Sequence, residues 1–494
     1  MKKTRIILLL FSAMQLAGIN NISANTESGL HLTTSNLKVK ADGKELCTAE
    51  LQQAIDRIAA QGGGQLTFTP GRYLTGGLML RSGVELYLEE GATLLGSADP
   101  RHYRLPDGLS APDNPDKVTT YALIAACGVE HVTLAGHGTI DGQGLQLALT
   151  IDSLHHTGEL IDPIYNVRRH RPNTRPSLFF FHQCRDIQVD GLCLKSSAGW
   201  GLSFEQCEWL TLSHLDVENR AYWNNDGIDV TDCRHVRISD CRVNAADDGI
   251  CLKSDCADLC NYDVEIARCD IRSSASAVKF GTASWGGFRK IHVHDINIRD
   301  TFRSCIAIES VDGGIIDSVL VERIEAENTG NAIFLRLGQR NGEQQGVLRH
   351  VTIRDLKCQL PFGRPDEAYD LRGPEVDFFH NPFPCSICGI PGNAIEDVLI
   401  ENVNISYPGR ATKGMAYMPL WRLDDVPEEI GKYPEFSMFG ELPAWGFYVR
   451  HVNRITFHCV HLSLRDSDFR PAFVFDDVHL LTMEQVTPDE SVFN

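Results

Sequence analysis

The stretch that decides the fold runs from residue 228 to residue 252 and reads IDVTDCRHVRISDCRVNAADDGICL. It opens on the apolar run 228–230, continues through a β-rich run at 235–238, and ends where the run 250–252 repeats the first. Asp, Asn and Gly, which favour tight turns, stand between these runs. Short runs bounded by turn residues predict β-strands, and helical periodicity is missing from this part of the sequence.

The same pattern recurs along the chain as a drifting repeat. Apolar runs begin at residues 202, 228, 250, 278, 306 and 333, at intervals of 26, 22, 28, 28 and 27 residues. Up to three short strands per unit, with turn residues at the corners, are typical of one coil of a parallel β-helix. A leucine-rich repeat would need its own Leu and Asn spacing, and a propeller would need a longer unit. We therefore predict an all-β fold, a single-stranded right-handed parallel β-helix.

The ends and interruptions of the repeat also carry predictions. An amphipathic pattern over residues 49–60, with Thr48 as its N-cap, predicts a helix that covers the open N-terminal end of the coils. The first coils are expected to begin at 65–68 and 78–80. Residues 146–177, 360–395 and 408–446 break the repeat and are expected to form long inserted loops, where specificity often resides.

The N-terminus has the features of an export signal. Lys2, Lys3 and Arg5 precede an apolar stretch that extends to about Ala17 and is too short to span a membrane. We predict a signal peptide over residues 1–24 and one β-helix domain over residues 25–494. The protein is therefore expected to be periplasmic or secreted, to act as a monomer, and not to insert into the membrane.

The net charge narrows the possible binding partners, and the cysteine positions indicate how the thiols are packed. The net charge of −19 argues against nucleic acid and anionic membranes as partners. Four of the sixteen cysteines fall at similar points of successive units and predict a ladder of buried thiols rather than disulfides. These are Cys184, Cys207, Cys233 and Cys269. The pair Cys385 and Cys388 could form a local disulfide, staple a loop or contribute to a zinc site.

Aligning the coils on residues 228, 250, 278, 306 and 333 separates inward from outward side chains. Positions zero and plus two are apolar in every coil and are expected to point inward, so positions plus one and plus three point outward. The outward charged residues are Asp229, Lys253, Lys279, Glu309 and Arg336. They could either bind an anionic ligand or be solvated charges on an outer face.

Three aspartates precede this face. Asp226 and Asp248 both stand two residues before position zero, on coils about 4.8 Å apart, and Asp247 adjoins Asp248. Carboxylates so close cannot all ionise freely, so one suits a general acid and another a base, as glycosidic hydrolysis requires. Asp-rich turns also bind calcium or simply shape the chain, and the spacing alone does not exclude either role.

At these residues the sequence resembles glycoside hydrolase family 28, the polygalacturonase and rhamnogalacturonase group. Asn224-Asn225-Asp226 matches the family's Asn-x-Asp motif, and Asp247-Asp248 matches its Asp-Asp pair. The resemblance implies an inverting hydrolase of α-glycosidic bonds in pectic polysaccharide, of the galacturonan or rhamnogalacturonan type, without a metal or other cofactor. It implies Asp247 as the general acid, with Asp226 and Asp248 activating water.

Two departures from the family's pattern concern substrate binding. Ser276 replaces the histidine of Gly-His-Gly, and Ala307-Ile308-Glu309 replaces the Arg-Ile-Lys that grips galacturonate. Cleavage of plain polygalacturonan is therefore in question. The candidate substrate-binding residues are Asn224, Lys253, Lys279, Glu309, Arg336 and Trp285.

Other functions stay open at this point. A β-helix polysaccharide lyase or epimerase would use calcium and a cationic base, and a catalytically silent carbohydrate-binding β-helix would need none of the aspartates. His292 and His294 alternate on another face, and we assign them no metal role.

Overall fold

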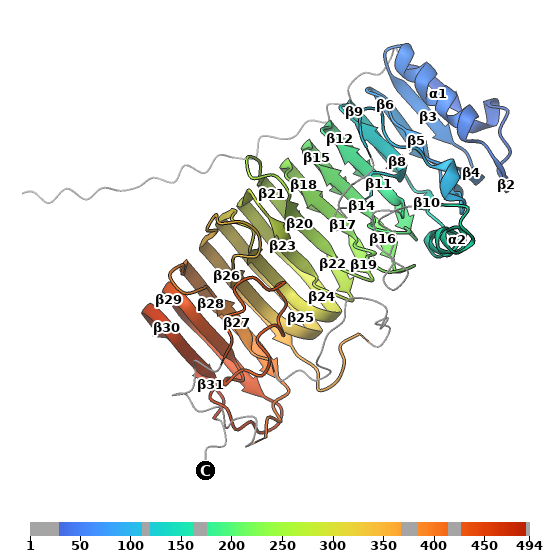
Figure 1. Ribbon diagram of the computed structural model, residues 1–494. Coiled ribbons are helices and arrows are strands. Elements are labelled where there is room, and N and C mark those ends of the chain that lie inside the picture. The colour runs from blue at the N-terminus through green and yellow to red at the C-terminus, as the bar shows by residue number, and fades with distance from the viewer. Residues whose placement is uncertain (1–28, 111–118, 162–174, 367–382, 413–425, 491–494) are drawn as a thin grey trace, which may run out of the picture.

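The computed structural model describes residues 29–110, 119–161, 175–366, 383–412 and 426–490. The strands form three parallel ladders along an elongated molecule, with the N-terminal helix at one end and the last strands at the other (Figure 1). Each turn of the chain adds one strand to each ladder, which confirms the predicted parallel β-helix. The predicted signal peptide lies outside the described residues.

The first ladder carries the aligned positions discussed above. Its shorter strands are β5 (Leu78–Met79), β8 (Ala122–Cys127), β11 (Ser177–His182), β14 (Leu202–Glu205), β17 (Ile228–Thr231), β20 (Ile250–Ser254), β23 (Val278–Ser284) and β27 (Cys385–Cys388). The registers Ile228↔Ile250, Ile250↔Val278 and Val278↔Ile306 confirm the sequence alignment of these coils.

The other two ladders complete each coil. The second contains β1 (Leu30–Thr33), β3 (Gly64–Phe68), β6 (Val84–Leu88), β9 (Glu130–Gly136), β12 (Arg185–Asp190), β15 (Glu208–Ser213), β18 (Arg234–Ser239) and β21 (Asn261–Ala267). The third contains β2 (Asp42–Leu46), β4 (Gly71–Thr75), β7 (Ala92–Gly96), β10 (Thr139–Asp141), β13 (Cys193–Lys195), β16 (Asp216–Asn219), β19 (Arg242–Ala245), β22 (Asp270–Ser273) and β31 (Thr487–Pro488). Long strands that bend through two or three ladders are β24 (Gly287–Ser310), β25 (Ile315–Leu337), β26 (Val347–Gln359), β28 (Ile395–Tyr407), β29 (Phe447–Leu464) and β30 (Phe473–Glu484).

The core is a stack of apolar side chains inside the coils. The residues at position zero of the alignment and those at plus two are fully buried, as predicted. They are Ile228, Ile250, Val278, Ile306 and Ile333, with Val230, Leu252, Phe280, Ile308 and Leu335. Each such side chain stabilises the fold by roughly 1.5–3 kcal/mol relative to exposure, so the coil stack is a rigid support for surface chemistry.

The N-terminal helix is present, but its cap differs from the prediction. Helix α1 spans Thr48–Ala60, and Cys47 is the N-cap residue, whose side chain makes no capping hydrogen bond to the helix. The Thr48 hydroxyl instead accepts a 2.7 Å hydrogen bond from the Gly76 backbone N–H, which ties the helix to a neighbouring coil. The coils also begin earlier than expected, because β1 and β2 precede the helix and pair with β3 and β4.

Two of the predicted long loops contain regular structure. Helix α2 (Gly144–Thr157) overlaps the start of the 146–177 segment, and its Leu147, Ala148 and Ile151 are buried. Residues 162–174, 367–382 and 413–425 of the three predicted loops lie outside the described residues. Strand β27 lies in the 360–395 segment and pairs with both β25 and β29. Both were missed because each is a single element without a repeated pattern. Two short 3-10 helices, η1 (Thr34–Asn36) and η2 (Pro100–His102), complete the described elements.

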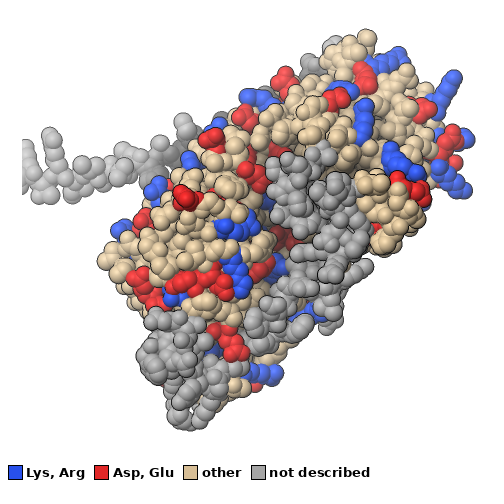
Figure 2. All heavy atoms as spheres, viewed as in Figure 1, with Lys and Arg blue, Asp and Glu red and all other residues tan. Residues whose placement is uncertain are grey.

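The cysteines behave largely as predicted, with one correction. Cys184, Cys207 and Cys233 are stacked and buried, but Asn261 occupies the next position and Cys269 instead lies beside Cys241. All sixteen cysteines are free thiols. Cys385 and Cys388 are buried in β27, where the Cys385 thiol lies 3.1 Å from the Tyr407 hydroxyl, so the local disulfide is not formed. Over the described residues, no helix is long and apolar enough to cross a membrane. The face seen in Figure 2 carries acidic and basic side chains interspersed with other residues.

Candidate active site

The backbone brings Asp226 and Asp248 to the same point of adjacent coils. Each stands two residues before a first-ladder strand, and the Gly227 N–H donates a 2.9 Å hydrogen bond to the Asp248 carbonyl. Gly227 has no room for a side chain, because a Cβ atom there would lie 2.4 Å from the Gly249 carbonyl oxygen. The tight Asp-Gly turn therefore aligns the two aspartates on neighbouring coils, as the sequence predicted.

Buried amides hold the turn that carries Asp226. The Asn225 side chain donates to the carbonyls of Ser197 (3.1 Å) and Gly199 (2.6 Å) on the preceding coil. The Asn219 amide donates a 2.7 Å hydrogen bond to the Asp226 carbonyl. Because Asn219 and Asn225 are fully buried and bonded, the Asp226 backbone has little freedom to move.

Arg175 supports the turn from the other side and was not singled out as a site residue. Its buried guanidinium donates to the carbonyls of Ala198 (2.7 Å) and Trp223 (2.6 Å) and to the Asn224 side-chain oxygen (3.0 Å). The other end of the Asn224 amide lies 3.5 Å from an Asp247 carboxylate oxygen. Arg175 therefore orients Asn224 toward Asp247.

Two lysines neutralise the aspartates. The Lys253 ammonium lies 3.3 Å from Asp226 and 2.8 Å from Asp229, and the Lys279 ammonium lies 3.1 Å from Asp248. Both lysines are buried, at 7% and 2% exposure. The outward charges of this face are therefore paired and covered, and the alternative that they are solvated is wrong for these residues.

A distant segment covers this face and brings in two further charged or polar groups. Tyr433 accepts a 3.3 Å hydrogen bond from Lys279, and Glu435 pairs with Arg303. Arg303 is 3% exposed and stands three residues before position zero of its coil, the same position as Asp247 two coils earlier. That alignment was the sequence signal for Arg303, whereas nothing in the local sequence pointed to Tyr433 or Glu435.

The three aspartates differ in their tendency to ionise. Burial, followed by repulsion from Asp248, raises the pKa of Asp247. Burial and the neighbouring Asp229 carboxylate raise the pKa of Asp226 well above its usual range. Burial acts in the same direction on Asp248, but the charges of Lys279 and Lys253 outweigh it, and the Asp248 pKa is lowered.

Both oxygens of the buried Asp248 carboxylate have a donor within the protein, which stabilises its ionised form. One oxygen accepts a 3.1 Å hydrogen bond from the Ser276 N–H, and the other receives the Lys279 ammonium. In contrast, Asp226 Oδ1 is buried without a hydrogen-bond partner among the described residues. Glu309, near Lys279, is also buried, and burial raises its pKa to about 8.

Two predicted substrate-binding residues do not join this cluster. The Arg336 guanidinium is buried and donates to the carbonyls of Gly389 (3.0 Å), Glu428 (2.8 Å) and Glu429 (2.9 Å), so it anchors the covering segment. Trp285 follows the last residue of β23, at the opposite end of the face from the aspartates, and is half-buried. Asn224, Lys253, Lys279 and Glu309 do lie with the aspartates.

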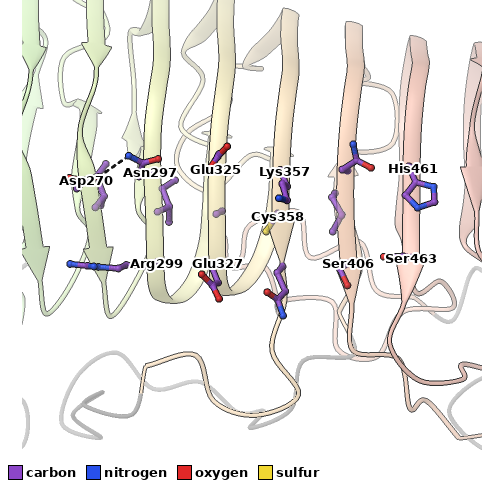
Figure 3. A pocket seen from close by; sticks show the side chains of 16 residues that line it. Asp270, Asn297, Arg299, Glu325, Glu327, Lys357, Cys358, Ser406, His461 and Ser463 are labelled. Carbon is purple, nitrogen blue, oxygen red and sulfur yellow. Dashed lines mark hydrogen bonds between the residues drawn. The ribbon is translucent and has the colours of Figure 1, made fainter.

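A separate groove of about 1010 Å³ runs along the third ladder and is open to the surface (Figure 3). Its floor is formed by rows of polar side chains from successive coils, including Asp270, Asn297, Glu325, Lys357 and His461. None of its lining residues belongs to the aspartate cluster. The groove also lacks the cluster's buried, oppositely shifted carboxylates, so size alone does not make it the candidate active site.

The comparison with known families decides the assignment. The model of the family described as Glycosyl hydrolases family 28 matches residues 110–359, which include all three aspartates. The chain belongs to glycosyl hydrolase family 28. The family 28 assignment makes the protein a glycoside hydrolase, and the family's substrate class is pectic polysaccharide.

Relatives of this family 28 chain agree with the assignment. It is 25% identical to a probable polygalacturonase of Vitis vinifera, over 75% of this chain and 73% of the relative. It is 21% identical to an endo-polygalacturonase of Pectobacterium carotovorum, over 71% and 86% of the two chains.

Solved structures support the fold. The Yersinia enterocolitica family 28 exopolygalacturonase matches with a TM-score of 0.68 and 16% identity, over 94% of this chain and 79% of that one. A hyperthermoactive exopolygalacturonase from Thermotoga maritima matches with a TM-score of 0.60 and 20% identity, over 76% and 87%. At these identities the likeness establishes the β-helix.

Proposed function

We propose that this family 28 enzyme is exported and hydrolyses α-glycosidic bonds of pectic polysaccharide by inversion. The observation that carries the proposal is the contrast between the adjacent Asp247 and Asp248. The Lys279 ammonium lies 3.1 Å from Asp248 and helps to lower its pKa, whereas burial raises the pKa of Asp247. A carboxyl that keeps its proton can protonate the leaving oxygen, while an ionised neighbour can remove a proton from water.

The contacts suggest how the roles divide. Asp247, whose pKa is raised, is the proposed general acid, and Asn224 at 3.5 Å orients its carboxyl. Asp248 is the proposed base, because Lys279 and the Ser276 N–H stabilise its ionised form. Asp226 is proposed to hold the attacking water through Oδ1, since Lys253 occupies only its Oδ2. Asp247 gives its proton to the leaving oxygen as the glycosidic bond breaks, the water oxygen bonds to the anomeric carbon, and Asp248 takes one proton from that water, so atoms and charge balance.

The substrate is proposed to be a mixed or substituted pectic chain. Lys279 pairs with Asp248 and Arg303 pairs with Glu435, so both cations are already engaged by carboxylates of the protein. A subsite whose cations are already paired favours a neutral sugar over galacturonate. We therefore expect faster cleavage of rhamnogalacturonan or defined pectic oligosaccharides than of unsubstituted polygalacturonan.

The roles of the lysines also change relative to the sequence-based expectation. Lys253 and Lys279 are proposed to hold aspartates in their working ionisation states, because their ammonium groups already pair with those carboxylates. The same pairing disfavours calcium at the trio, since two ammonium groups supply the positive charge that the cation would bring. A lyase that depends on calcium is accordingly the weaker alternative.

The test is hydrolysis by the purified chain lacking residues 1–24. The substrates are unsubstituted polygalacturonan, rhamnogalacturonan and defined pectic oligosaccharides. NMR follows the anomeric configuration of the first product. The Asp247→Asn variant is compared with the wild type on each substrate. The variant should lose about 100- to 10,000-fold in kcat. Asp190→Asn, which removes a surface carboxylate bonded to Ser213 and His214, is the matched control and should keep full activity. Full activity of Asp247→Asn, or unsaturated uronide products, would exclude the proposed mechanism.

Export is tested separately by expressing the complete chain in a Gram-negative host. Activity in the periplasmic or external fraction, and an N-terminus near Asn25 on the recovered protein, are the expected results. Recovery of an unprocessed chain in the cytoplasm would refute the export proposal.

A further inference from the structure

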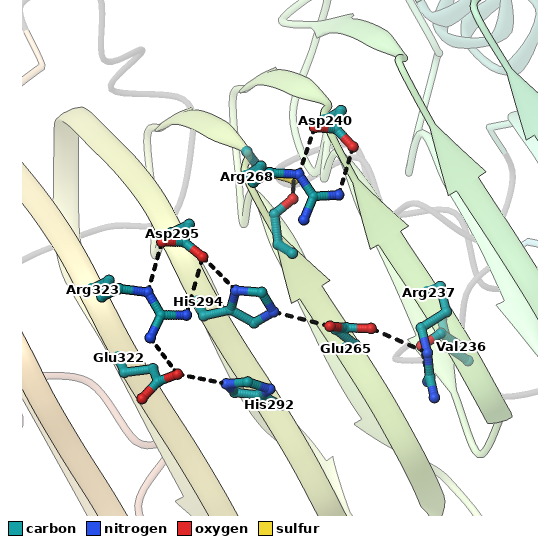
Figure 4. A network of polar contacts seen from close by, with 12 residues as sticks. Val236, Arg237, Asp240, Glu265, Arg268, His292, His294, Asp295, Glu322 and Arg323 are labelled. Carbon is teal, nitrogen blue, oxygen red and sulfur yellow. Dashed lines mark hydrogen bonds and ion pairs between the residues drawn. The ribbon is translucent and has the colours of Figure 1, made fainter. Parts of the chain in front are cut away.

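A second cluster of chemically active side chains lies on the second ladder, whereas the aspartate site lies on the first (Figure 4). His292 and His294 alternate along β24 and therefore share one face of the strand. Glu265 on β21 stands directly opposite His292 on the neighbouring coil. Among the described residues, this is the one group of three His, Cys, Asp or Glu whose ligand atoms converge closely.

The geometry suits a small cation. The His294 Nε2 lies 3.0 Å from a Glu265 carboxylate oxygen, and one ligand atom from each of the three residues lies within 4.8 Å of the other two. Two ligands of one tetrahedral zinc ion, each about 2.0–2.1 Å from the metal, lie roughly 3.3 Å apart. Side-chain rotations, in which His292 Nε2 exchanges its 3.1 Å contact with Glu322 for the metal, would bring all three atoms to bonding distance without moving the strands.

The surrounding contacts resemble the outer shell of a metal site. Asp295 accepts a 2.6 Å hydrogen bond from the His294 Nδ1–H, which leaves Nε2 directed at Glu265. Two acceptors, Nε2 and the Glu265 oxygen, then face each other unless a proton or a metal ion lies between them. Asp295 is held in turn by Arg323 at 2.7 Å, so the histidine ring is oriented by a fixed carboxylate.

Convergence of the ligand atoms distinguishes this cluster from the other histidine–carboxylate groups. Asp477 also pairs with two histidines, His451 and His479, but among the described residues only the Glu265 cluster brings three ligand atoms within 4.8 Å of one another. His350, for example, pairs with Asp317 at 2.8 Å and Asp397 at 3.5 Å but has no histidine beside it. In the cluster the two imidazole rings lie 4.2 Å apart, centroid to centroid. Two imidazoles and one carboxylate form a donor set that favours zinc over calcium or magnesium.

We propose that Glu265, His292 and His294 bind one zinc ion, which clamps two adjacent coils of the second ladder. A solvent molecule completes the coordination, because the His292 and Glu265 side chains are 38% and 40% exposed. The site lies outside the aspartate cluster, so its role is to stabilise the β-helix rather than to cleave the substrate.

Isothermal titration of the metal-stripped full domain with zinc chloride at neutral pH tests the site. One zinc ion per chain is expected, reversible by chelator, and calcium chloride should give no binding. His292→Gln and His294→Gln should each abolish this binding, and Asp295→Asn should weaken it by about 10- to 100-fold. His350→Gln is the matched control and should bind zinc as the wild type does.

A stability measurement provides a second readout. Zinc at about 100 times its Kd should raise the wild-type Tm by about 3 °C and leave the Tm of His294→Gln unchanged. Circular dichroism of each variant without metal checks that the β-helix is intact. Zinc binding that persists in the His292→Gln/His294→Gln double variant, or no zinc binding by the wild type, would overturn the proposal.

Discussion

Lys279 offers the sharpest test of how the aspartates are tuned. Its ammonium lies 3.1 Å from Asp248, and both residues are buried. At an effective dielectric constant of about 20, this attraction is worth about 5 kcal/mol, or about four pKa units. Lys253 and Arg303 also act on Asp248 and remain in the variant, so we expect Lys279→Met to raise the Asp248 pKa by about 1–3 units.

The direction of the effect on activity follows from the proposed role. Asp248 works as a base and must be ionised, so activity is present above its pKa and is lost as the pH falls through it. Removing Lys279 raises that pKa and moves the acidic limb of the kcat/KM profile about 1–3 pH units upward. Below the new limb, kcat/KM falls about tenfold per pH unit, while at higher pH much of the activity returns.

The assay measures kcat/KM for the preferred pectic substrate across the pH range, by release of reducing ends. Lys279→Arg keeps the charge and should keep the wild-type limb. Lys195→Met, which removes an exposed lysine 3.7 Å from Asp141, should change nothing. The reasoning is refuted if Lys279→Met lowers kcat/KM by the same factor at every pH, since that result assigns Lys279 to substrate binding. Melting curves identify any variant that is partly unfolded, because loss of a buried ion-pair partner costs about 3–5 kcal/mol.

Three further outcomes are expected. Arg175→Met should destabilise the fold by about 2–4 kcal/mol in urea titration and lower kcat, because three acceptors, among them the Asn224 side chain, lose a buried charged donor; unchanged kcat would remove its proposed positioning role. Glu309→Gln should be more stable than wild type near pH 8, by on the order of 2–4 kcal/mol, and the difference should shrink as the pH falls toward 4.5. The raised pKa of about 8 means that the folded state binds the Glu309 proton more tightly than the unfolded state does. Wild-type stability is therefore lost as the pH rises from about 4.5 to about 8. A parallel pH dependence of stability for both proteins would contradict this reasoning. Reducing agent should leave the Tm unchanged within about 1 °C, because all sixteen cysteines are free thiols, whereas a clear drop would reveal a disulfide.

The repeat made the fold and the aspartates accessible from sequence. A strand alternates its side chains with a period of two, so apolar residues at positions zero and plus two identified the core and aligned the coils. That alignment placed Asp226 and Asp248 at equivalent points, and the structural register Ile228↔Ile250 agrees with it. Arg303 stood in the same alignment, in the position of Asp247, and could have been found by the same reasoning.

The single elements were harder to predict than the repeat. Helix α2 and strand β27 occur once each, so no second copy reinforces their signal. Cys269 was misplaced because it stands before a third-ladder strand, β22, as Cys241 stands before β19, whereas Cys233 stands before the second-ladder strand β18. Cysteines at different corners of the coil look alike in sequence until the strands between them are assigned.

The sequence by itself determined that Asp226, Asp247 and Asp248 lie close together, because residues at equal positions of the repeat become neighbours when the coils stack. Their ionisation was decided only by the tertiary structure. The segment carrying Tyr433 and Glu435 covers the first ladder and buries Lys279, and burial makes each charge act strongly on the next. The partners of Arg336 and the convergence of Glu265 with His294 likewise join residues far apart in sequence. The spacing of residues in the sequence does not predict such contacts. They depend on which strands a long loop packs against and on the rotamer that each side chain adopts.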